Sequence, residues 1–411
     1  EEIVELEEAG NSYNGLRISS EAPLVLPFDI ALDRLREAGR GAIGTTGRGI
    51  GPVYESRVAR IGLTVNDLLN KDVFAAKLRR NLAARIDIFR QFDPVLVAKV
   101  LRTRVLEGGI YYLGEEKIFD VDAIVERYLA HAGKFSELIV DTDTLLRQKV
   151  ADNQRVLLEG AQGVLLSVLY GSYPYVTSSD CSLTGLAEGV GLRSEHVDYT
   201  LGVVKAPYMT RVGKGPFPTE LGGEASATWC NSPNGTKGYE QEKFPHASVN
   251  SADPFEQGVA LRHLGNEYGS TTGRLRRVGW LDLPLLRYAK RYGSKQGLGT
   301  VALTKVDVMS SCETVKLCIG YEYQGEDYRV GARVLTRGTR LETAIIDSTV
   351  LERSLPIYEE FPGWMSDLSG IRSRNDLPLN LRKIIAAIER NGEVAVDVLS
   401  LGPDRDETLV F

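Results

Sequence analysis

The stretch Val301-Ala302-Leu303-Thr304-Lys305-Val306-Asp307 decides the fold, because it is a short apolar run that ends abruptly in polar and charged residues. Three further runs have the same form, an apolar core followed by a polar, mostly glycine-bearing loop, at 156–158, 201–204 and 394–399. Such runs are typical of buried strands, and helix-like segments alternate with them. The alternation predicts an α/β fold in which a large, mainly parallel central sheet is flanked by helices.

Two segments show the spacing of amphipathic helices. Residues 72–92 carry apolar side chains at helical intervals, with Asp72 placed as the N-cap. Residues 381–390 follow Asn380 and precede Gly392, which are residue types typical of helix starts and ends. Both segments are therefore predicted to be helices.

Two other segments depart from this alternation. Residues 315–323 and 328–332, separated by Gln324-Gly325-Glu326-Asp327, are predicted to form a small hairpin. Residues 222–255 are polar, rich in glycine, asparagine, serine and proline, and without periodicity, so they are predicted to be a long surface insertion. Residues 1–411 are otherwise expected to form a single domain.

The composition restricts the possible functions. With 49 lysines and arginines against 55 aspartates and glutamates, the formal net charge is −6, whereas nucleic-acid binders usually have a basic surplus. The four cysteines show no paired spacing, which argues against a disulfide framework or a zinc site and favours a reducing compartment. No apolar run is long enough to cross a membrane, and no signal-peptide pattern is visible. We therefore expect a cytoplasmic protein that binds neither nucleic acid nor membrane.

Lys305 and Asp307 follow a predicted strand, at the end where open parallel sheets bind their ligands. A carboxylate there can accept hydrogen bonds from the N1–H and the exocyclic amine of guanine, and a lysine stem can lie across the base. Adenine offers no such pair of donors, so the pattern favours guanine. Because Lys-x-Asp also occurs by chance in polar loops, the motif alone indicates a guanine site in only about one case in four.

Three other loops have compositions that suit anions or a purine. Residues 44–52, Gly-Thr-Thr-Gly-Arg-Gly-Ile-Gly-Pro, let a phosphate approach the backbone closely, and Arg57 and Arg60 follow them. Residues 270–277 combine three hydroxyl side chains, a glycine and three arginines, which suits a dicarboxylate or a phosphate. Gln162 follows a predicted strand, and its amide can donate and accept along a purine edge. Each loop could instead be an ordinary charged surface loop.

Taken in order, these motifs closely resemble those of adenylosuccinate synthetases. The matching text is GTTGRGIGP with YESRVAR after it, EGAQG, YPYVTSS, TRVGKGPFPTEL, STTGRLRR followed by GW, LTKVD and SLGPDRDET, which together run from Gly44 to Thr408. Each motif is moderately distinctive, and eight in the same order leave little room for coincidence. The resemblance implies a form of the α/β fold similar to that of P-loop nucleotide hydrolases.

The resemblance implies a ligase that depends on GTP and magnesium and joins IMP and L-aspartate into adenylosuccinate, in AMP biosynthesis. In that chemistry the O6 of IMP is phosphorylated first, because the oxygen alone is a poor leaving group, and the aspartate amine then displaces the phosphate. GDP and phosphate are released. A homodimer is also implied, in which Arg60 reaches the IMP phosphate of the neighbouring subunit.

The resemblance also assigns residues of this chain to each ligand. IMP would be bound by Thr46, Arg60, Gln162, Thr177 and Arg274. Aspartate would be bound by Ser270, Thr271, Thr272, Gly273, Arg274, Leu275 and Arg276. GTP would be bound by Arg276, Lys305, Val306, Asp307, Ser400, Leu401 and Gly402. Arg57 and Gln162 would be catalytic, with Arg57 at the position of a lysine in the family's signature.

The chain departs from the family's pattern in two respects. Arg57 keeps the charge of the signature lysine, but a guanidinium differs from an ammonium in shape and hydration. The chain also shows neither the Gly-Asp-Glu-Gly-Lys-Gly phosphate loop of the family nor its Gly-His-Asn-Ala-Gly-His stretch. We therefore expect an N-terminally incomplete chain without the catalytic base, the catalytic acid or the magnesium ligands. Such a chain should be inactive alone, because phosphoryl transfer depends on positioning and charge stabilisation.

Two alternatives stay open at the level of the sequence. One is a truncated, non-catalytic relative that binds nucleotide or a partner subunit, and a phosphate loop encoded upstream in the gene would decide against it. The other is a related synthetase that acts on a guanine nucleotide in place of IMP. The residues Asp180-Cys181-Ser182-Leu183, which follow the YPYVTSS motif, keep this second alternative open.

Overall fold

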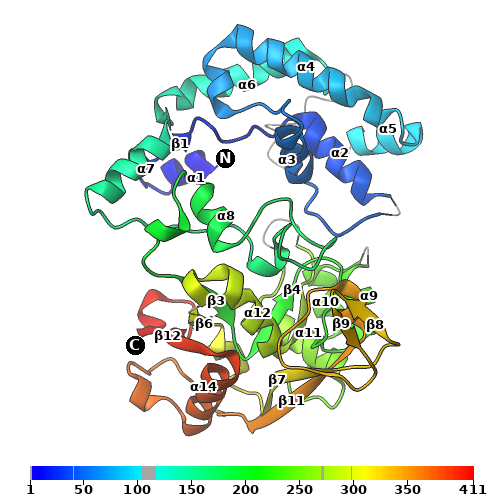
Figure 1. The fold of residues 1–411 in the computed structure, drawn as a ribbon, viewed down its shortest axis with the longest axis vertical. Coiled ribbons are helices and arrows are strands. Elements are labelled where there is room, and N and C mark those ends of the chain that lie inside the picture. The colour runs from blue at the N-terminus through cyan, green and yellow to red at the C-terminus, as the bar shows by residue number, and fades with distance from the viewer. Residues whose placement is uncertain (1, 40, 103–116, 233, 270–272, 298) are drawn as a thin grey trace. The chain divides into compact units, whose positions relative to one another are not determined.

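The computed structural model describes residues 2–39, 41–102, 117–232, 234–269, 273–297 and 299–411 (Figure 1). The chain divides into two compact units. The first unit comprises residues 1–159, 177–179 and 186–196, and the second comprises residues 160–176, 180–185 and 197–411. The expectation of a single domain stays a prediction.

The first unit is mainly helical. Its helices are α1 (Glu2–Glu8), α2 (Pro27–Glu37), α3 (Ile50–Val58), α4 (Lys71–Phe89), α5 (Pro94–Arg102), α6 (Val121–Phe135) and α7 (Thr142–Ala151). Two short strands, β1 (Ile18–Ser19) and β2 (Ile139–Val140), pair in parallel. Helices α2, α4, α5 and α6 enclose a hydrophobic core, in which Phe28 and Phe74 are fully buried.

Helix α4 confirms the helix predicted at residues 72–92, but its ends differ from the prediction. Asn70, not Asp72, is the N-cap, and its side chain accepts hydrogen bonds from the backbone N–H groups of Asp72 and Val73, both at 3.1 Å. Asp72 lies in the first turn instead, where a negative charge also favours the helix. Asparagine and aspartate serve equally well as N-caps, so the sequence left both starts open.

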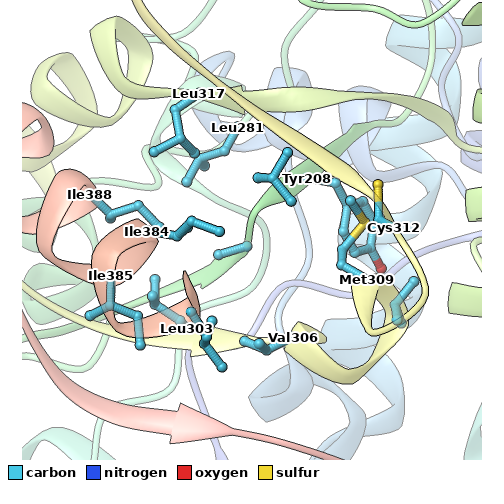
Figure 2. Packing of buried hydrophobic residues seen from close by; sticks show 14 of the residues in the cluster. Tyr208, Leu281, Leu303, Val306, Met309, Cys312, Leu317, Ile384, Ile385 and Ile388 are labelled. Carbon is cyan, nitrogen blue, oxygen red and sulfur yellow. The ribbon is translucent and has the colours of Figure 1, made fainter. Parts of the chain in front are cut away.

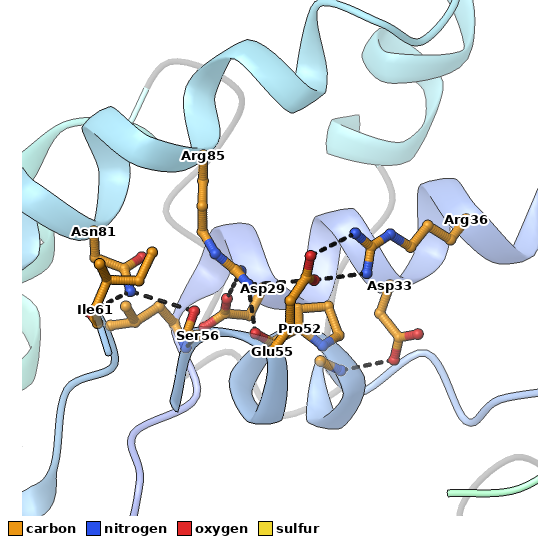
Figure 3. Close-up of polar contacts among 11 residues, drawn as sticks. Asp29, Asp33, Arg36, Pro52, Glu55, Ser56, Ile61, Asn81 and Arg85 are labelled. Carbon is orange, nitrogen blue, oxygen red and sulfur yellow. Dashed lines mark hydrogen bonds and ion pairs between the residues drawn. The ribbon is translucent and has the colours of Figure 1, made fainter. Parts of the chain in front are cut away.

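The buried face of α4 also carries a charge. Arg85 is almost completely buried and donates hydrogen bonds to the Asp29 carboxylate of α2 and to the Pro52 carbonyl of α3 (Figure 3). A buried guanidinium is tolerated only when its donors are paired, so Arg85 ties three helices together. It lies on the same helical stripe as Phe74 and Leu78, and the apolar pattern alone did not mark it.

The second unit contains two sheets and a separate hairpin (Figure 1). In the first sheet, the strands β3 (Leu201–Lys205), β6 (Gly299–Thr304) and β12 (Val394–Ser400) are parallel neighbours, and β13 (Thr408–Val410) is antiparallel to β12. The second sheet consists of β4 (Tyr208–Arg211), β5 (Arg277–Asp282), β7 (Thr314–Tyr323), β10 (Arg340–Leu341) and β11 (Ser354–Pro362). The predicted α/β class is confirmed, and three of the four predicted strands form the parallel part of the first sheet.

Several helices accompany these sheets. They are α9 (Gly223–Cys230), α10 (Lys237–Lys243), α11 (Pro254–Gly265), α12 (Leu283–Gly293), α13 (Ser348–Glu352) and α14 (Leu379–Gly392), whereas the residues of α8 (Leu183–Glu188) divide between the two units. The largest core of the unit joins α14 to both sheets: Ile384 and Ile388 pack with Leu303 of β6 and with Leu281 and Leu317 of the second sheet (Figure 2). Helix α14 thus confirms the helix predicted at 381–390, extended by two residues at each end.

One predicted strand is wrong. Residues 156–158 form no strand, and Leu157 exposes 90% of its surface. An apolar run becomes a strand only when a neighbour completes its backbone hydrogen bonds, and among the described residues no strand pairs with this run.

The hairpin is built from different strands than predicted. Residues 315–323 do form a strand, but this strand, β7, pairs with β5, β10 and β11 and not with the residues that follow it. The observed hairpin joins β8 (Tyr328–Val330) to β9 (Arg333–Leu335). Because β7 buries residues on both of its faces, it belongs inside a sheet and not in an exposed two-stranded ribbon.

The segment 222–255 has more structure than its composition indicated. It contains α9 and α10, and the Glu240 side chain of α10 is fully buried. Its assignment as an insertion stays a prediction, but the described part of the segment packs against the rest of the unit and is not a free surface loop.

Replacing Ile384 with alanine tests the core shown in Figure 2. Ile384 is 1% exposed, so the change should lower the free energy of unfolding by about 3 kcal/mol through lost burial and a residual cavity. The matched control is Leu379→Ala in the same helix, where the side chain is 59% exposed and the loss should stay below about 0.5 kcal/mol. Urea unfolding followed by circular dichroism measures both, and equal losses would contradict this account of the core.

Candidate active site

The parallel strands of the first sheet end together at one edge. The register aligns Leu303 of β6 with Val204 of β3 on one side and with Leu399 of β12 on the other. Residues 305–307 and 400–402, both predicted from the sequence to bind GTP, therefore lie beyond adjacent strand ends. This is the edge where open parallel sheets bind ligands.

Lys305 and Asp307 occupy the turn after β6. Lys305 has a left-handed backbone with φ of 62°, and its ammonium donates a hydrogen bond to the Gly265 carbonyl at 2.9 Å. Asp307 is half-buried, and this burial raises its pKa despite the opposing effect of Lys305. A partly desolvated carboxylate forms stronger hydrogen bonds than one in bulk water, so Asp307 is suited to accept hydrogen bonds from the N–H groups of a base.

The neighbouring loop after β12 is held by local hydrogen bonds. The Ser400 hydroxyl donates to the Gly402 carbonyl at 3.0 Å, and the Leu401 N–H donates to the Glu407 carbonyl at 2.9 Å. A Cβ at Gly402 would displace the Glu407 carboxylate, which therefore packs closely against the backbone of this loop.

Two of the residues predicted to bind GTP have side chains in the core. Val306 is 1% exposed and Leu401 is 2% exposed, and both belong to the largest hydrophobic cluster. Their backbone atoms can face a ligand, but their side chains cannot.

A buried carboxylate lies beside this sheet edge. Glu267 is fully buried and accepts hydrogen bonds from Lys205 Nζ at 2.7 Å, from the Tyr208 hydroxyl at 2.6 Å and from Arg276 Nη1 at 2.9 Å. Burial by itself raises the pKa of Glu267, but the hydrogen bonds from Lys205, Tyr208 and Arg276 outweigh it and lower the pKa below its ordinary value. The carboxylate therefore stays ionised and joins the end of β3 to the residues after α11.

Residues 268–276, which we call the arginine loop, contain the predicted aspartate-binding residues. Ser270, Thr271 and Thr272 lie outside the described residues. Tyr268 and Leu275 pair in an antiparallel bridge, and the Arg276 N–H donates to the Glu267 carbonyl at 3.0 Å. Leu275 is buried, whereas Gly273 and Arg274 are exposed and Arg276 is half-buried. Among the described residues of the loop, the two arginines are thus the side chains that can meet an anion.

The glycine-rich loop of the first unit is anchored by a carboxylate of α2. Asp33 accepts hydrogen bonds from the Thr45 hydroxyl at 3.0 Å and from the Gly49 N–H at 2.9 Å. Gly49 has φ of 84°, and a Cβ there would lie only 2.9 Å from the Ile30 nitrogen, so glycine is required. The loop is therefore fixed at its ends, while Thr46 between them is exposed.

The segment that contains Thr177 lies against α3 within the same unit. A Cβ built on Gly51, at the start of α3, would lie 3.5 Å from the Ser178 hydroxyl oxygen. Thr177 therefore lies near the loop that carries Thr46, although the two motifs are far apart in the sequence.

Arg57 and Arg60 line one cavity of the first unit, with a volume of about 160 Å³. Arg57 also donates to the Glu21 carbonyl at 3.2 Å, and both arginines are exposed. The predicted IMP-binding residues divide between the units: Thr46, Arg60 and Thr177 belong to the first, and Gln162 and Arg274 to the second.

Among the described residues, no three histidine, cysteine, aspartate or glutamate side chains come together in a way that could hold a metal ion. No described helix is long and apolar enough to cross a membrane.

Sequence reasoning missed the anchors of these loops. Asp33 and Glu267 carry no motif of their own, because a single acidic residue in a helix or a turn is usually solvated. Lys205 could have been recognised as a candidate site residue from the sequence. It directly follows the predicted strand 201–204, much as Lys305 follows the predicted strand 301–303.

The fold and these loops are those of the α/β proteins that bind ligands beyond the carboxyl ends of parallel strands. Comparison with known proteins identifies the family. The family model for adenylosuccinate synthetase matches residues 1–409, and the chain belongs to this family of ligases in purine biosynthesis. The resemblance read from the motifs is thus confirmed.

Individual relatives agree with this assignment. The adenylosuccinate synthetase of Oceanobacillus iheyensis is 35% identical over 415 residues, which cover 100% of this chain and 80% of the relative, and that of Streptococcus gordonii is 35% identical over 412 residues with the same coverage. A fully ligated adenylosuccinate synthetase from Plasmodium falciparum has a similar structure, with a TM-score of 0.76 at 28% identity, covering 100% of this chain and 82% of that one. Because the family match begins at residue 1, it gives no support to the expected lack of an N-terminal segment. The expected inactivity of the chain, which depended on that lack, loses its support.

Replacing Glu267 with glutamine tests the buried carboxylate. The change leaves Lys205 and Arg276 without a counter-charge and should lower the free energy of unfolding by about 3 kcal/mol at pH 7. Since the folded-state pKa of Glu267 is depressed, its stabilisation is complete above its unfolded pKa near 4.5 and is lost as the pH falls through the folded value. The difference between wild type and variant should therefore shrink below about pH 4.

Urea unfolding at a series of pH values measures this difference. Glu242→Gln is the matched control, because Glu242 is exposed on α10 and its loss should cost under about 0.5 kcal/mol at every pH. A pH-independent difference for Glu267→Gln would show that the charge of Glu267 is not what stabilises this cluster.

Proposed function

We propose that this chain catalyses the GTP-dependent ligation of IMP and L-aspartate to adenylosuccinate. The observation that supports this most strongly is the meeting of residues 305–307 and 400–402 at one sheet edge, beside the Glu267 cluster that holds Arg276. Family membership supports the same reaction.

In this proposal, Asp307 recognises guanine. Its carboxylate accepts from the N1–H and the exocyclic amine of the base, and the hydrogen bond from the Lys305 ammonium to the Gly265 carbonyl holds the lysine stem. Ser400 and Gly402 supply the adjacent wall, together with backbone atoms of Val306 and Leu401. Magnesium, when bound, neutralises charge on the transferring phosphoryl group.

The substrate aspartate binds to the arginine loop. Arg274 and Arg276 present planar guanidinium groups that match carboxylates, and the bond to Glu267 fixes the orientation of Arg276. A guanidinium held by one carboxylate keeps further donors for a second one, so the loop can orient the dicarboxylate. The predicted participation of Ser270, Thr271, Thr272, Gly273 and Leu275 is part of the same proposal.

The remaining assignments rest on the resemblance to the family. We propose that IMP is bound by Thr46, Arg60, Gln162, Thr177 and Arg274, and that Arg57 and Gln162 take part in catalysis. We also propose a cytoplasmic location and a homodimer in which Arg60 reaches the IMP phosphate of the neighbouring subunit.

The variant Asp307→Asn tests the guanine assignment. Loss of the charged acceptor should weaken GTP binding about 30-fold, equivalent to ~2 kcal/mol, and leave ATP binding unchanged. Calorimetric titration with each nucleotide measures the selectivity. Asp327→Asn, an exposed aspartate in the turn between β7 and β8, is the control and should bind GTP as wild type does. An unchanged ratio of GTP to ATP affinity in Asp307→Asn would refute the assignment.

Sedimentation equilibrium tests the homodimer. The expected mass is twice that of one chain, and IMP should bind about tenfold more weakly to Arg60→Ala than to wild type, because a charge-assisted bond to phosphate is lost. A monomer with wild-type affinity for IMP would contradict both parts of this prediction.

A further inference from the structure

The stem of the arginine loop packs on the segment 222–255. The stem consists of residues 266–269 and 274–276, which are joined by the bridged pair Tyr268 and Leu275, and the side chains of this pair are buried. They form a separate hydrophobic cluster with Cys230 of α9, against which Trp229 also packs. The core of the stem is therefore supplied by residues that the sequence had placed in a surface insertion.

The next turn of the segment makes polar contacts with the same stem. Thr236 pairs with Arg274 in an antiparallel bridge. The Lys237 ammonium donates to the Asn266 side-chain oxygen at 2.9 Å and lies 5.4 Å from the centre of the Tyr268 ring. Backbone pairing with Thr236 thus extends the side of the stem that contains Arg274. Lys237 holds the other side, through its contacts with Asn266 and Tyr268.

A buried carboxylate joins these elements. Glu240 of α10 is fully buried and accepts from the Trp229 indole N–H at 2.8 Å, from the Arg262 guanidinium at 2.7 Å and from the Tyr268 hydroxyl at 3.3 Å. A buried carboxylate with several donors is costly to disturb, because each donor would lose its partner. Glu240 therefore makes α9, α10, α11 and the stem a single rigid support.

We propose that α9, α10 and residues 234–236 are a brace that positions Arg274 and Arg276 and so determines the affinity for L-aspartate. This inference rests on the proposed role of the arginine loop in binding aspartate. Arg276 is held from one side by Glu267, and Arg274 is held from the other by the brace through Thr236. The ligand then meets two arginines whose backbone is already in place and does not have to order that backbone itself.

Contacts with the brace set the fraction of molecules in which the stem is closed. The stem is closed by the hydrogen bond from the Gly269 N–H to the Arg274 carbonyl at 2.8 Å and by that from the Arg276 N–H to the Glu267 carbonyl at 3.0 Å. If brace contacts are lost, stems open more often, and the apparent affinity falls in proportion to the closed fraction. Arg274 is also assigned to IMP and Arg276 to GTP, but most of the proposed contacts of these two ligands lie outside the loop. Their binding should therefore change less than that of aspartate.

The variant Lys237→Ala removes the contacts with Asn266 and the Tyr268 ring, and Tyr268→Phe removes the hydrogen bond to Glu240. Both keep the apolar packing of the stem. Each should raise the KM for aspartate about fivefold, with the KM values for IMP and GTP and the kcat within about twofold of wild type. Hydrogen exchange of the Gly269 and Arg276 amides should become about tenfold faster. Lys237→Arg should restore both quantities, because it keeps the charge over the Tyr268 ring.

Lys243→Ala is the matched control from the same helix. Lys243 lies over the rings of Trp229, Tyr239 and Phe244, and the described residues 266–269 and 273–276 are not among its ring contacts. It should leave the aspartate KM and the exchange of both amides unchanged.

Two outcomes would overturn the brace. One is an unchanged aspartate KM in both Lys237→Ala and Tyr268→Phe, and the other is an equal rise in the KM values for all three substrates. Arg274→Ala separates these failures from that of the proposed function. If Arg274→Ala leaves aspartate binding unchanged, the assignment of the loop to aspartate falls, and the proposed role of the brace falls with it. If Arg274→Ala raises the aspartate KM and the brace variants do not, only the brace is refuted.

Discussion

A carboxylate removed from water must be paired, and the arrangement of the strand-end loops depends on one such group, Glu267. It is fully buried, yet it accepts from Lys205, Tyr208 and Arg276, which come from β3, β4 and the arginine loop. Three donors stabilise the ionised form more than burial destabilises it. Since these donors can only converge when the strand ends and the loop are in place, this one carboxylate links the fold to the site.

The same device recurs at the other loops of the described structure. Asp33 holds the glycine-rich loop of the first unit through the Thr45 hydroxyl and the Gly49 N–H. Glu240 holds the brace against the stem of the arginine loop. In each case an acidic side chain from a helix satisfies donors that the loop cannot pair by itself. The described residues that these carboxylates hold are therefore in place before any ligand arrives, which lowers the entropy lost on binding.

The apolar runs at 201–204, 301–303 and 394–399 predicted strands correctly, because each of them pairs with a parallel neighbour in the first sheet. The equally apolar run at 156–158 failed, since a strand is defined by its neighbours and not by its own composition. Pairing also decided the hairpin, where β7 joins distant strands in place of the residues that follow it. The composition of the segment 222–255 did not indicate its helices, because its order comes from contacts with distant residues, such as those of Glu240 with Arg262 and Tyr268.

By itself, the sequence determined the α/β class, the family and the residues that resemble its ligand contacts. Those conclusions depend on local patterns, namely short apolar runs and motifs such as LTKVD and STTGRLRR. Only the tertiary structure decided that Val306 and Leu401 turn their side chains into the core, and that Glu267, Asp33 and Glu240 are buried and paired. The physical reason is that burial and pairing are relations between segments far apart in the chain. From the sequence alone, an acidic residue that is solvated cannot be distinguished from one that is buried and anchors a loop.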